Sequence, residues 1–420
     1  MLAPLALVTL SAEAAVRLLT PGEPLPPPSP VDVRDHFTAQ EIARGRRFAR
    51  PQLAIGLARS ALDTAALAYL VRRLARRSLP AGTAASDGSS VAAGASAALA
   101  GAVLSTVMAI PGLPLSALTR QRALRVGLAT QSWRDWGLDL AKGSAIQGGL
   151  AAAGGAAVTV AARLWPRGWW LPAAGGSVAF GAMFAALAPV VLDPIFNDFT
   201  PLPNDELRRD ILALADAAGV SVGEVYSVDA SRRTTAANAY VTGLGPTKRV
   251  VLFDTLLDRF DRDQVKVVVA HELAHVRHHD VPRSVAFAAL TSPAAAFAVQ
   301  RLSWAMSPLR ARASAGALPA LALATGTVAL PLALLSSRLS RAVERRADEF
   351  SLRLSQAPQA FISFERAIAL QNMADLQPPR LLTSLLSTHP PTAERIGAAV
   401  AYELTRPAAA GSPTIGNPAG

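Results

Sequence analysis

Long hydrophobic runs separated by short polar segments occupy most of the chain. A run of about 20 apolar residues is long enough to cross the hydrocarbon core of a membrane as a helix. The pattern predicts seven such helices, at residues 2–19, 53–70, 95–115, 144–164, 170–191, 284–306 and 315–335. The first is the weakest, because Glu13 and Arg17 interrupt it. No basic segment stands before it, as a secretory signal peptide would require.

Residues 195–280 have the mixed pattern of a small domain outside the lipid. A polar helix is expected at 204–219, followed by β-type runs at 225–228 and 249–253 and then by a second helix. The fold class predicted from these patterns is an α-helical polytopic membrane protein of about seven transmembrane helices with a small α+β domain.

The same changes in pattern predict the domain boundaries. Residues 1–192 form an N-terminal membrane domain of about five helices, and residues 193–400 form a second domain that the spans at about 284–306 and 315–335 interrupt. The small residues of 401–420 predict a disordered tail. The Gly, Ser and Ala residues at 81–94 predict a loop.

Composition agrees with a membrane protein, since 51% of the residues are hydrophobic and 17% are charged. The net charge of +11 could indicate nucleic acid binding. However, the arginines are spread along the chain without a basic block interleaved with aromatic residues, which argues against a nucleic acid partner. The chain has no cysteine, so thiolate ligands and disulfides are excluded.

The helix predicted around residues 267–279 carries the clearest chemistry. His271 and His275 are four positions apart and share one helix face, so both imidazoles can bind a single zinc ion. Glu272 can then accept a proton from a water that zinc has acidified. Such a five-residue pattern also occurs by chance. The apolar residues at 267–270 indicate that the helix is buried, where a His-Glu-His cluster without a metal would be costly.

A third ligand must lie on the same side of the membrane as His275. Two spans separate His275 from a polar helix that carries Glu344 and Asp348 on one face. We predict Glu344 as the third ligand and Asp348 as a carboxylate that orients a histidine ligand. Taken alone, that helix could equally be a solvated amphipathic surface, and its pairing with the histidine motif favours the metal site.

These motifs resemble, in order, those of the integral-membrane zinc metalloproteases of the CAAX prenyl protease 1 type. The resemblance covers roughly residues 37–396 and is strong from Asp193 onward. The matching segments are residues 199–203, 231–233, 238–240, 251–256, 271–275, 340–348 and 387–391. The resemblance implies that the helices enclose an intramembrane chamber and that a gluzincin-type catalytic domain closes one end.

Site roles follow from the resemblance residue by residue. It implies about one zinc ion per chain on His271, His275 and Glu344, with Glu272 as general base and Asp348 as support. It also implies that Asn238, Ala239 and Tyr240 form an edge strand along which an extended peptide lies, and that His389 stabilises the oxyanion.

The predicted function is therefore hydrolysis of peptide bonds by a membrane-embedded zinc metalloendopeptidase. Whether its peptide or protein substrate is lipidated stays open, because the Ala and Arg bias suggests a bacterium, which need not contain prenylated proteins. A quality-control protease without prenyl specificity, an inactive membrane scaffold and a transporter are the alternatives. The arginine distribution mildly favours an active site on the cytoplasmic side of the cell membrane.

Overall fold

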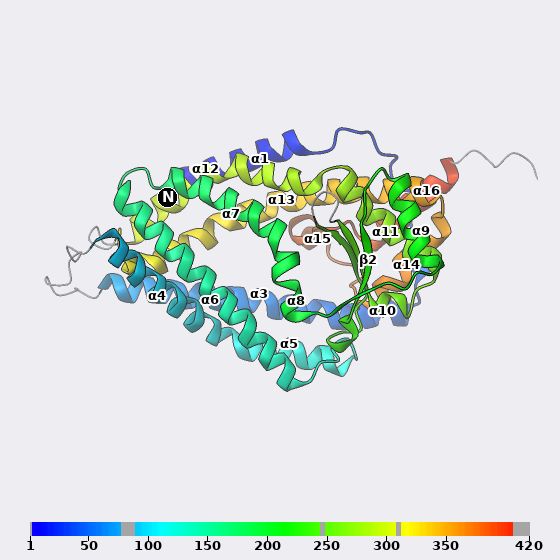
Figure 1. Cartoon of the computed structure of the whole chain (residues 1–420), viewed down its shortest axis with the longest axis horizontal. Coiled ribbons are helices and arrows are strands. Elements are labelled where there is room, and N and C mark those ends of the chain that lie inside the picture. The colour runs from blue at the N-terminus through cyan, green and yellow to red at the C-terminus, as the bar shows by residue number, and fades with distance from the viewer. Residues whose placement is uncertain (1, 77–88, 244–247, 308–311, 406–420) are drawn as a thin grey trace, which may run out of the picture.

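The structure is a computed structural model that describes residues 2–76, 89–243, 248–307 and 312–405 (Figure 1). Seven helical segments in these ranges are long and apolar enough to cross a membrane, which confirms the predicted fold class. They are α1 (Leu2–Leu19), α3 (Ala39–Arg76), α4 with α5 (Ser90–Ala109 and Leu113–Arg125, joined by a 3₁₀ turn at Ile110–Gly112), α6 (Trp133–Leu164), α7 (Trp170–Val191), α12 (Asp280–Met306) and α13 (Leu318–Ser355).

Several helices extend well past the apolar runs that predicted them. The most important is α13, a single helix of 38 residues that contains Pro331. The sequence predicted a span ending at residue 335 and a separate polar helix from residue 336. Because α13 is continuous, the same helix that forms the last membrane span also carries Glu344 and Asp348 into the domain outside the membrane.

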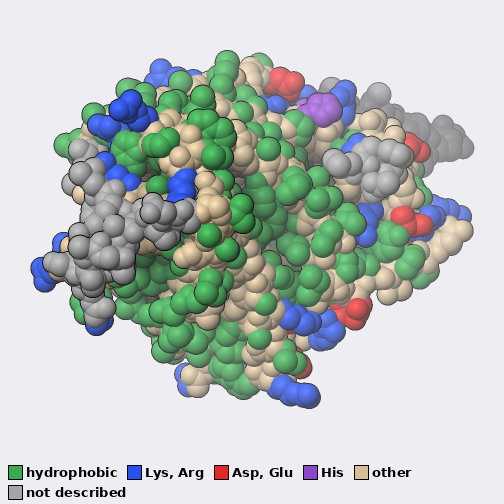
Figure 2. Space-filling view, turned by 60° about the vertical axis from the view of Figure 1, so that its left-hand side comes forward, with side chains coloured by type: hydrophobic (Ala, Val, Ile, Leu, Met, Phe, Trp, Pro, Cys, Tyr) green, Lys and Arg blue, Asp and Glu red, His purple; other side chains and the backbone are tan. Residues whose placement is uncertain are grey.

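The membrane helices do not form a solid bundle. In Figure 1, α1, α7, α12 and α13 lie on one side of the membrane part, and α3, α4 and α6 lie on the other. None of the most apolar window of α7 is buried, and only 6% of that of α3 is buried. Helices this exposed agree with an arrangement around an interior space. Figure 2 shows that hydrophobic side chains dominate the visible surface of this part, as a lipid-facing surface requires.

A four-stranded sheet organises the small α+β domain. Its strands are β1 (Phe199–Pro201), β2 (Glu224–Val228), β3 (Ala239–Thr242) and β4 (Arg249–Phe253), in the order β1-β2-β4-β3. The β2–β4 pair is parallel and the other two pairs are antiparallel. In this sheet β3 is an edge strand, as the resemblance implied for residues 238–240.

Eight shorter helices complete the chain. They are α2 (Val33–His36), α8 (Asp193–Phe196), α9 (Glu206–Ala217), α10 (Asp254–Leu257), α11 (Arg262–Arg277), α14 (Pro358–Gln371), α15 (Arg380–Leu386) and α16 (Thr392–Thr405). The described core joins one face of the sheet to α9, α11 and α14 through fully buried apolar residues, among them Val250, Leu252, Ile211, Leu273 and Phe361.

Two predicted irregular segments are shorter than expected. The helix α4 begins at Ser90, so the end of the loop predicted at 81–94 is helical, and residues 81–88 lie outside the described residues. The helix α16 continues to Thr405 and buries Ala401, so the start of the predicted tail 401–420 is also helical. Residues 406–420 lie outside the described residues.

Candidate metal centre

Helices α11 and α13 bring His271, His275 and Glu344 together. A capping box between Asp261 and Gln264 starts α11, whose apolar face buries His271 deep in the domain. The Nε2 atoms of the two histidines are 3.3 Å apart. The Glu344 carboxylate lies 3.2 Å from Nε2 of His271 and 3.7 Å from Nε2 of His275. One ligand atom from each residue lies within 4.8 Å of the other two, as binding of one metal ion requires.

Two further carboxylates fix the orientation of the imidazoles. Nδ1 of His271 lies 2.9 Å from Oδ1 of Asp348, which is the residue predicted for this role. Nδ1 of His275 lies 3.0 Å from Oδ2 of Asp280, which the sequence analysis did not identify. When the rings are neutral, each Nδ1–H donates to a carboxylate, so each Nε2 presents a lone pair to the space beside Glu344.

The residues fit a divalent metal. Two nitrogen lone pairs and a carboxylate converge, and Oε2 of Glu344 is buried without a hydrogen bond. Such a group of acceptors is unfavourable unless a proton or a cation occupies it. Burial alone would lower the pKa of His271, but the carboxylates of Asp348 and Glu344 outweigh it and raise the pKa to about 10. A metal bound here must therefore displace a proton. Two histidines and one carboxylate form a common catalytic zinc site with an open fourth position.

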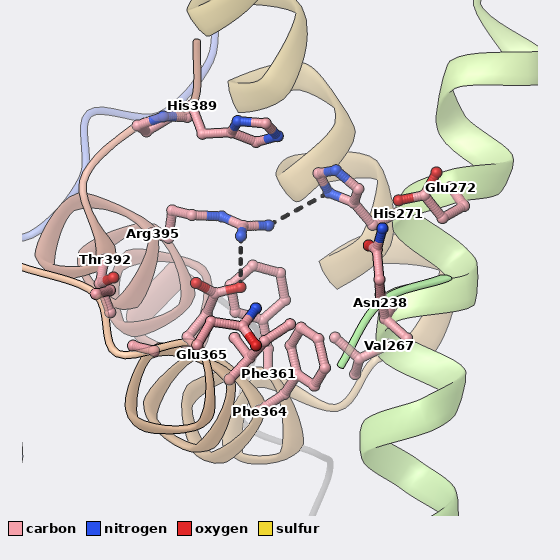
Figure 3. Close-up of a pocket in the computed structure, with 16 residues that line it drawn as sticks. Asn238, Val267, His271, Glu272, Phe361, Phe364, Glu365, His389, Thr392 and Arg395 are labelled. Carbon is pink, nitrogen blue, oxygen red and sulfur yellow. Dashed lines mark hydrogen bonds and ion pairs between the residues drawn. The ribbon is translucent and has the colours of Figure 1, made fainter. Parts of the chain in front are cut away.

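Glu272 faces a cavity of about 410 Å³ beside His271 (Figure 3). The cavity lies between α11, the start of β3, α14 and the segment from His389 to Arg395. Burial raises the pKa of Glu272, and the neighbouring histidines offset this only in part. A carboxyl group with a raised pKa is a stronger proton acceptor than an ordinary carboxylate, as a general base requires.

A second cavity, of about 470 Å³, reaches the centre from another direction. Its lining includes His275, Glu344 and Thr388, together with residues of α12 and α13 such as Phe287 and Leu339. No residue lines both cavities, but each includes predicted metal ligands. The two cavities thus provide space on two sides of the metal centre for a chain that passes across it.

Of the four remaining predicted site residues, Asn238 and His389 line the first cavity, and Ala239 and Tyr240 do not. Asn238 lines it, and Ala239 and Tyr240 continue from it as the edge strand β3. The hydroxyl of Tyr240 donates to Asp193 at 3.2 Å. His389 also lines the cavity, with Nε2 3.5 Å from Oε2 of Glu344, and 62% of its side chain is exposed.

A buried ion-pair cluster behind His271 was missed by the sequence analysis. Arg395 of α16 contacts both oxygens of Asp348, at 2.9 and 2.5 Å, and lies 2.7 Å from Oε1 of Glu365 on α14. It also approaches Nδ1 of His271 at 3.5 Å, as the dashed lines in Figure 3 show. The only signal in the sequence was that Arg395 and Glu365 are charged residues on otherwise apolar helix faces.

Comparisons with known proteins agree with this geometry. Residues 201–403 match peptidase family M48. The chain is 31% identical over 306 residues to a Bacillus subtilis protein described as uncharacterized metalloprotease YhfN, a match that covers 70% of this chain and 71% of that protein. It is 41% identical over 105 residues to CAAX prenyl protease 1 of Saccharomyces cerevisiae, which covers 25% of this chain and 23% of that protein.

A solved structure extends the likeness to the whole fold. The crystal structure of Ste24p from S. mikatae superposes with a TM-score of 0.75 over 95% of this chain and 96% of that chain, at 19% identity. The bilayer-length helices, the convergent ligands and these matches lead to one conclusion. The chain belongs to peptidase family M48, and it is a membrane metalloprotease of the CAAX prenyl protease 1 type.

Proposed function

We propose that the protein is a zinc-dependent endopeptidase embedded in the membrane, with about one zinc ion per chain on His271, His275 and Glu344. The observation that carries the proposal is the convergence of these three side chains beside a cavity that Glu272 faces. A metal site that served only to stabilise the fold would be closed by a fourth protein ligand and would not need a buried carboxylate at its open side.

The residues around the site have different roles in hydrolysis. A zinc ion held there would polarise the peptide carbonyl and lower the pKa of a water molecule to about 7. Glu272 takes a proton from the attacking water and passes it to the leaving amine. Asp348 and Asp280 hold the two imidazoles in the tautomer that leaves Nε2 free for the metal.

Two further groups bind the substrate. The free edge of β3, beginning at Asn238, Ala239 and Tyr240, offers backbone N–H and C=O groups to an extended peptide. Desolvation on the cavity side of the ring lowers the pKa of His389, which favours the neutral imidazole although much of the side chain is exposed. In the tautomer in which Thr388 Oγ1 donates to Nδ1 of His389, 3.0 Å away, Nε2–H of His389 can donate to the developing oxyanion.

The substrate is a peptide or protein that reaches the site from the bilayer or its surface. Similarity to CAAX prenyl protease 1 supports a lipidated peptide. The alternative is quality control of membrane proteins without prenyl specificity, which the similarity to an uncharacterized metalloprotease leaves open. We place the protein in a bacterial cell membrane, with the active site toward the cytoplasm. An inactive scaffold is disfavoured because Glu272 is present.

The test compares wild type with Glu272→Gln, both purified in detergent. We expect both proteins to hold about one zinc ion per chain, and only the wild type to cleave a proteome-derived peptide library. A farnesylated CAAX peptide, compared with its unmodified form, decides between the two substrate classes. A chelator should abolish cleavage, and added zinc should restore it.

The outcomes separate the alternatives. Zinc bound by both proteins without cleavage by either would favour the scaffold. Cleavage by Glu272→Gln at the wild-type rate would remove Glu272 from the mechanism. Absence of zinc from both proteins would overturn the metal assignment.

A further inference from the structure

Glu365 is a buried carboxylate in the wall of the catalytic cavity that hydrolysis does not use. It is only 2% exposed and lies on α14. Phe361, Phe364 and Ile368 lie on the same helix face, at the spacing of one helical turn, and line the same cavity. Figure 3 shows Glu365 and the two phenyl rings on one side of this space and Val267 of α11 across from them. The cavity therefore has an apolar wall with the carboxylate of Glu365 beside it, and Arg395 lines the cavity as well.

Glu365 shares its only cationic partner among the described residues. Arg395 hydrogen-bonds to both oxygens of Asp348 but makes no hydrogen bond to Oε1 of Glu365. That oxygen, Oε1, lies 2.7 Å from Nη1 of Arg395 in an ion pair whose geometry does not make a hydrogen bond. Burial raises the pKa of Glu365 to about 7, and the positive charge of Arg395 offsets this only in part.

Charge around the cavity is thus unbalanced. Two buried carboxylates, those of Asp348 and Glu365, share the single guanidinium of Arg395. When Glu365 is ionised, this cluster therefore carries one more negative charge than positive charge. A buried carboxylate in this situation is costly, and a cation placed in the cavity would relieve the cost.

We propose that this cavity binds a basic side chain of the substrate, at one of the two residues that flank the scissile bond. The apolar stem of a lysine or arginine packs against Phe361, Phe364 and Val267, and its charged end reaches the carboxylate of Glu365. Because His271 and Glu272 line the same cavity, the side chain it receives must belong to a residue next to the reacting carbonyl. The inference rests on the proposed endopeptidase function and names a substrate class for it.

The experiment uses peptides that differ at one position. Starting from a sequence cut by the wild type, each residue flanking the scissile bond is replaced in turn by lysine, norleucine or acetyl-lysine. Norleucine keeps the stem without the amine, and acetyl-lysine keeps the length without the charge. The wild type, Glu365→Gln and Glu349→Gln are compared by kcat/KM. Glu349 is the matched control, because it is buried in an ion pair with Arg353 at 2.8 Å and lies outside this cavity.

At one position we expect the wild type and Glu349→Gln to prefer lysine over both analogues by at least about tenfold, the effect of one buried charged contact. We expect Glu365→Gln to lose that preference while it retains metal. Equal kcat/KM for lysine and norleucine in the wild type would overturn the proposal without touching the protease assignment. So would a lysine preference that Glu365→Gln preserves.

Two further measurements keep the outcomes distinct. If Glu365→Gln loses its metal, its kcat/KM values cannot be compared, and the wild-type preference for lysine over the two analogues alone decides whether the pocket binds a basic side chain. Binding of the peptides to Glu272→Gln, followed by fluorescence anisotropy, gives the ratio of the affinities for lysine and for each analogue without turnover. If no peptide is hydrolysed, library peptides that bind Glu272→Gln are substituted in the same way at each position. This measurement then decides the pocket, and failure of hydrolysis counts only against the proposed function.

Discussion

Asp280 reaches the metal centre from the turn that follows α11. His279 has a left-handed backbone with φ of 56°, which reverses the chain so that Asp280 folds back onto His275. Arg346 and Arg283 in turn pair with Asp280. Asp280 could not be predicted from the sequence, because a spacing of five is not a helical neighbour spacing and the left-handed turn at a non-glycine residue has no clear sequence signal.

Replacing Asp280 tests whether it orients His275. Asp280→Asn keeps the shape but removes the charge that fixes Nδ1–H, so we expect metal affinity to fall about 10- to 100-fold. Competition with a chromophoric chelator measures the affinity. Asp216→Asn, on the exposed side of α9, is the control and should leave it unchanged. Equal affinities in both variants would show that Asp280 only stabilises the fold.

At the residue scale, the sequence predicts which side chains share a face where one helix supplies the geometry. The periodicity of α11 placed His271, Glu272 and His275, and the periodicity of α13 placed Glu344 with Asp348. Arg395 and Glu365 could not be placed, because their contact depends on how α16 packs on α14. That packing joins side chains 30 positions apart and leaves no local periodic pattern to read.

At the scale of elements, α13 holds the segment that carries His389. Arg341 is buried three residues before Glu344, and its guanidinium donates to the carbonyl oxygens of Thr383, Ser384 and Ser387. These carbonyls belong to the end of α15, where that of Thr383 also accepts from the backbone N–H of Ser387 at 3.2 Å. Ser387 Oγ then donates to the carbonyl of His389 at 2.7 Å. One helix therefore positions both the predicted third ligand and the predicted oxyanion donor.

Arg341→Lys should weaken the hydrogen bonds that hold the segment before His389 against α13, while it keeps the positive charge. A lysine ammonium cannot reproduce the planar fork that contacts three carbonyls, so we expect kcat to fall by about tenfold while metal content is retained. Arg345→Lys, one turn further on the same helix and exposed, is the control. In a His389→Asn background, Arg341→Lys should add less than about a twofold loss, because the two residues act in series. A full additional loss would mean that Arg341 acts independently of His389.

For the whole molecule, hydropathy predicted the membrane helices better than their ends. A lipid-facing segment must be apolar over a fixed length, so each span left a strong signal. The ends were harder to predict because helices such as α6 and α13 continue into polar sequence, where lipid no longer dictates composition. The low burial of α3 and α7 could not be predicted, since an apolar helix face is the same whether it meets lipid or another helix.

Orientation in the membrane is the remaining whole-molecule prediction. The segments next to the catalytic domain, at 34–50 and 120–142, carry nine arginines, against eight at 72–77, 163–167 and 310–312, which the sequence predicts on the opposite side. Because basic segments tend to stay inside, this small excess mildly favours a catalytic domain in the cytoplasm, which we predict. Because the chain has no cysteine, a single introduced cysteine is its only thiol. Labelling of that thiol therefore reports on which side of the membrane the substituted position lies. Suitable exposed positions are Ser221 in the catalytic domain and Arg167 in the α6–α7 turn.

A membrane-impermeant maleimide applied to intact cells should label Arg167→Cys and leave Ser221→Cys unlabelled until the cells are permeabilised. The reverse labelling would place the active site outside the cytoplasm. Substrates would then have to be secreted or membrane-exposed proteins, and processing of cytoplasmic lipidated peptides would be ruled out. Labelling therefore constrains the substrate class as well as the topology, because a peptide can be cut only on the side where the edge strand and the metal centre lie.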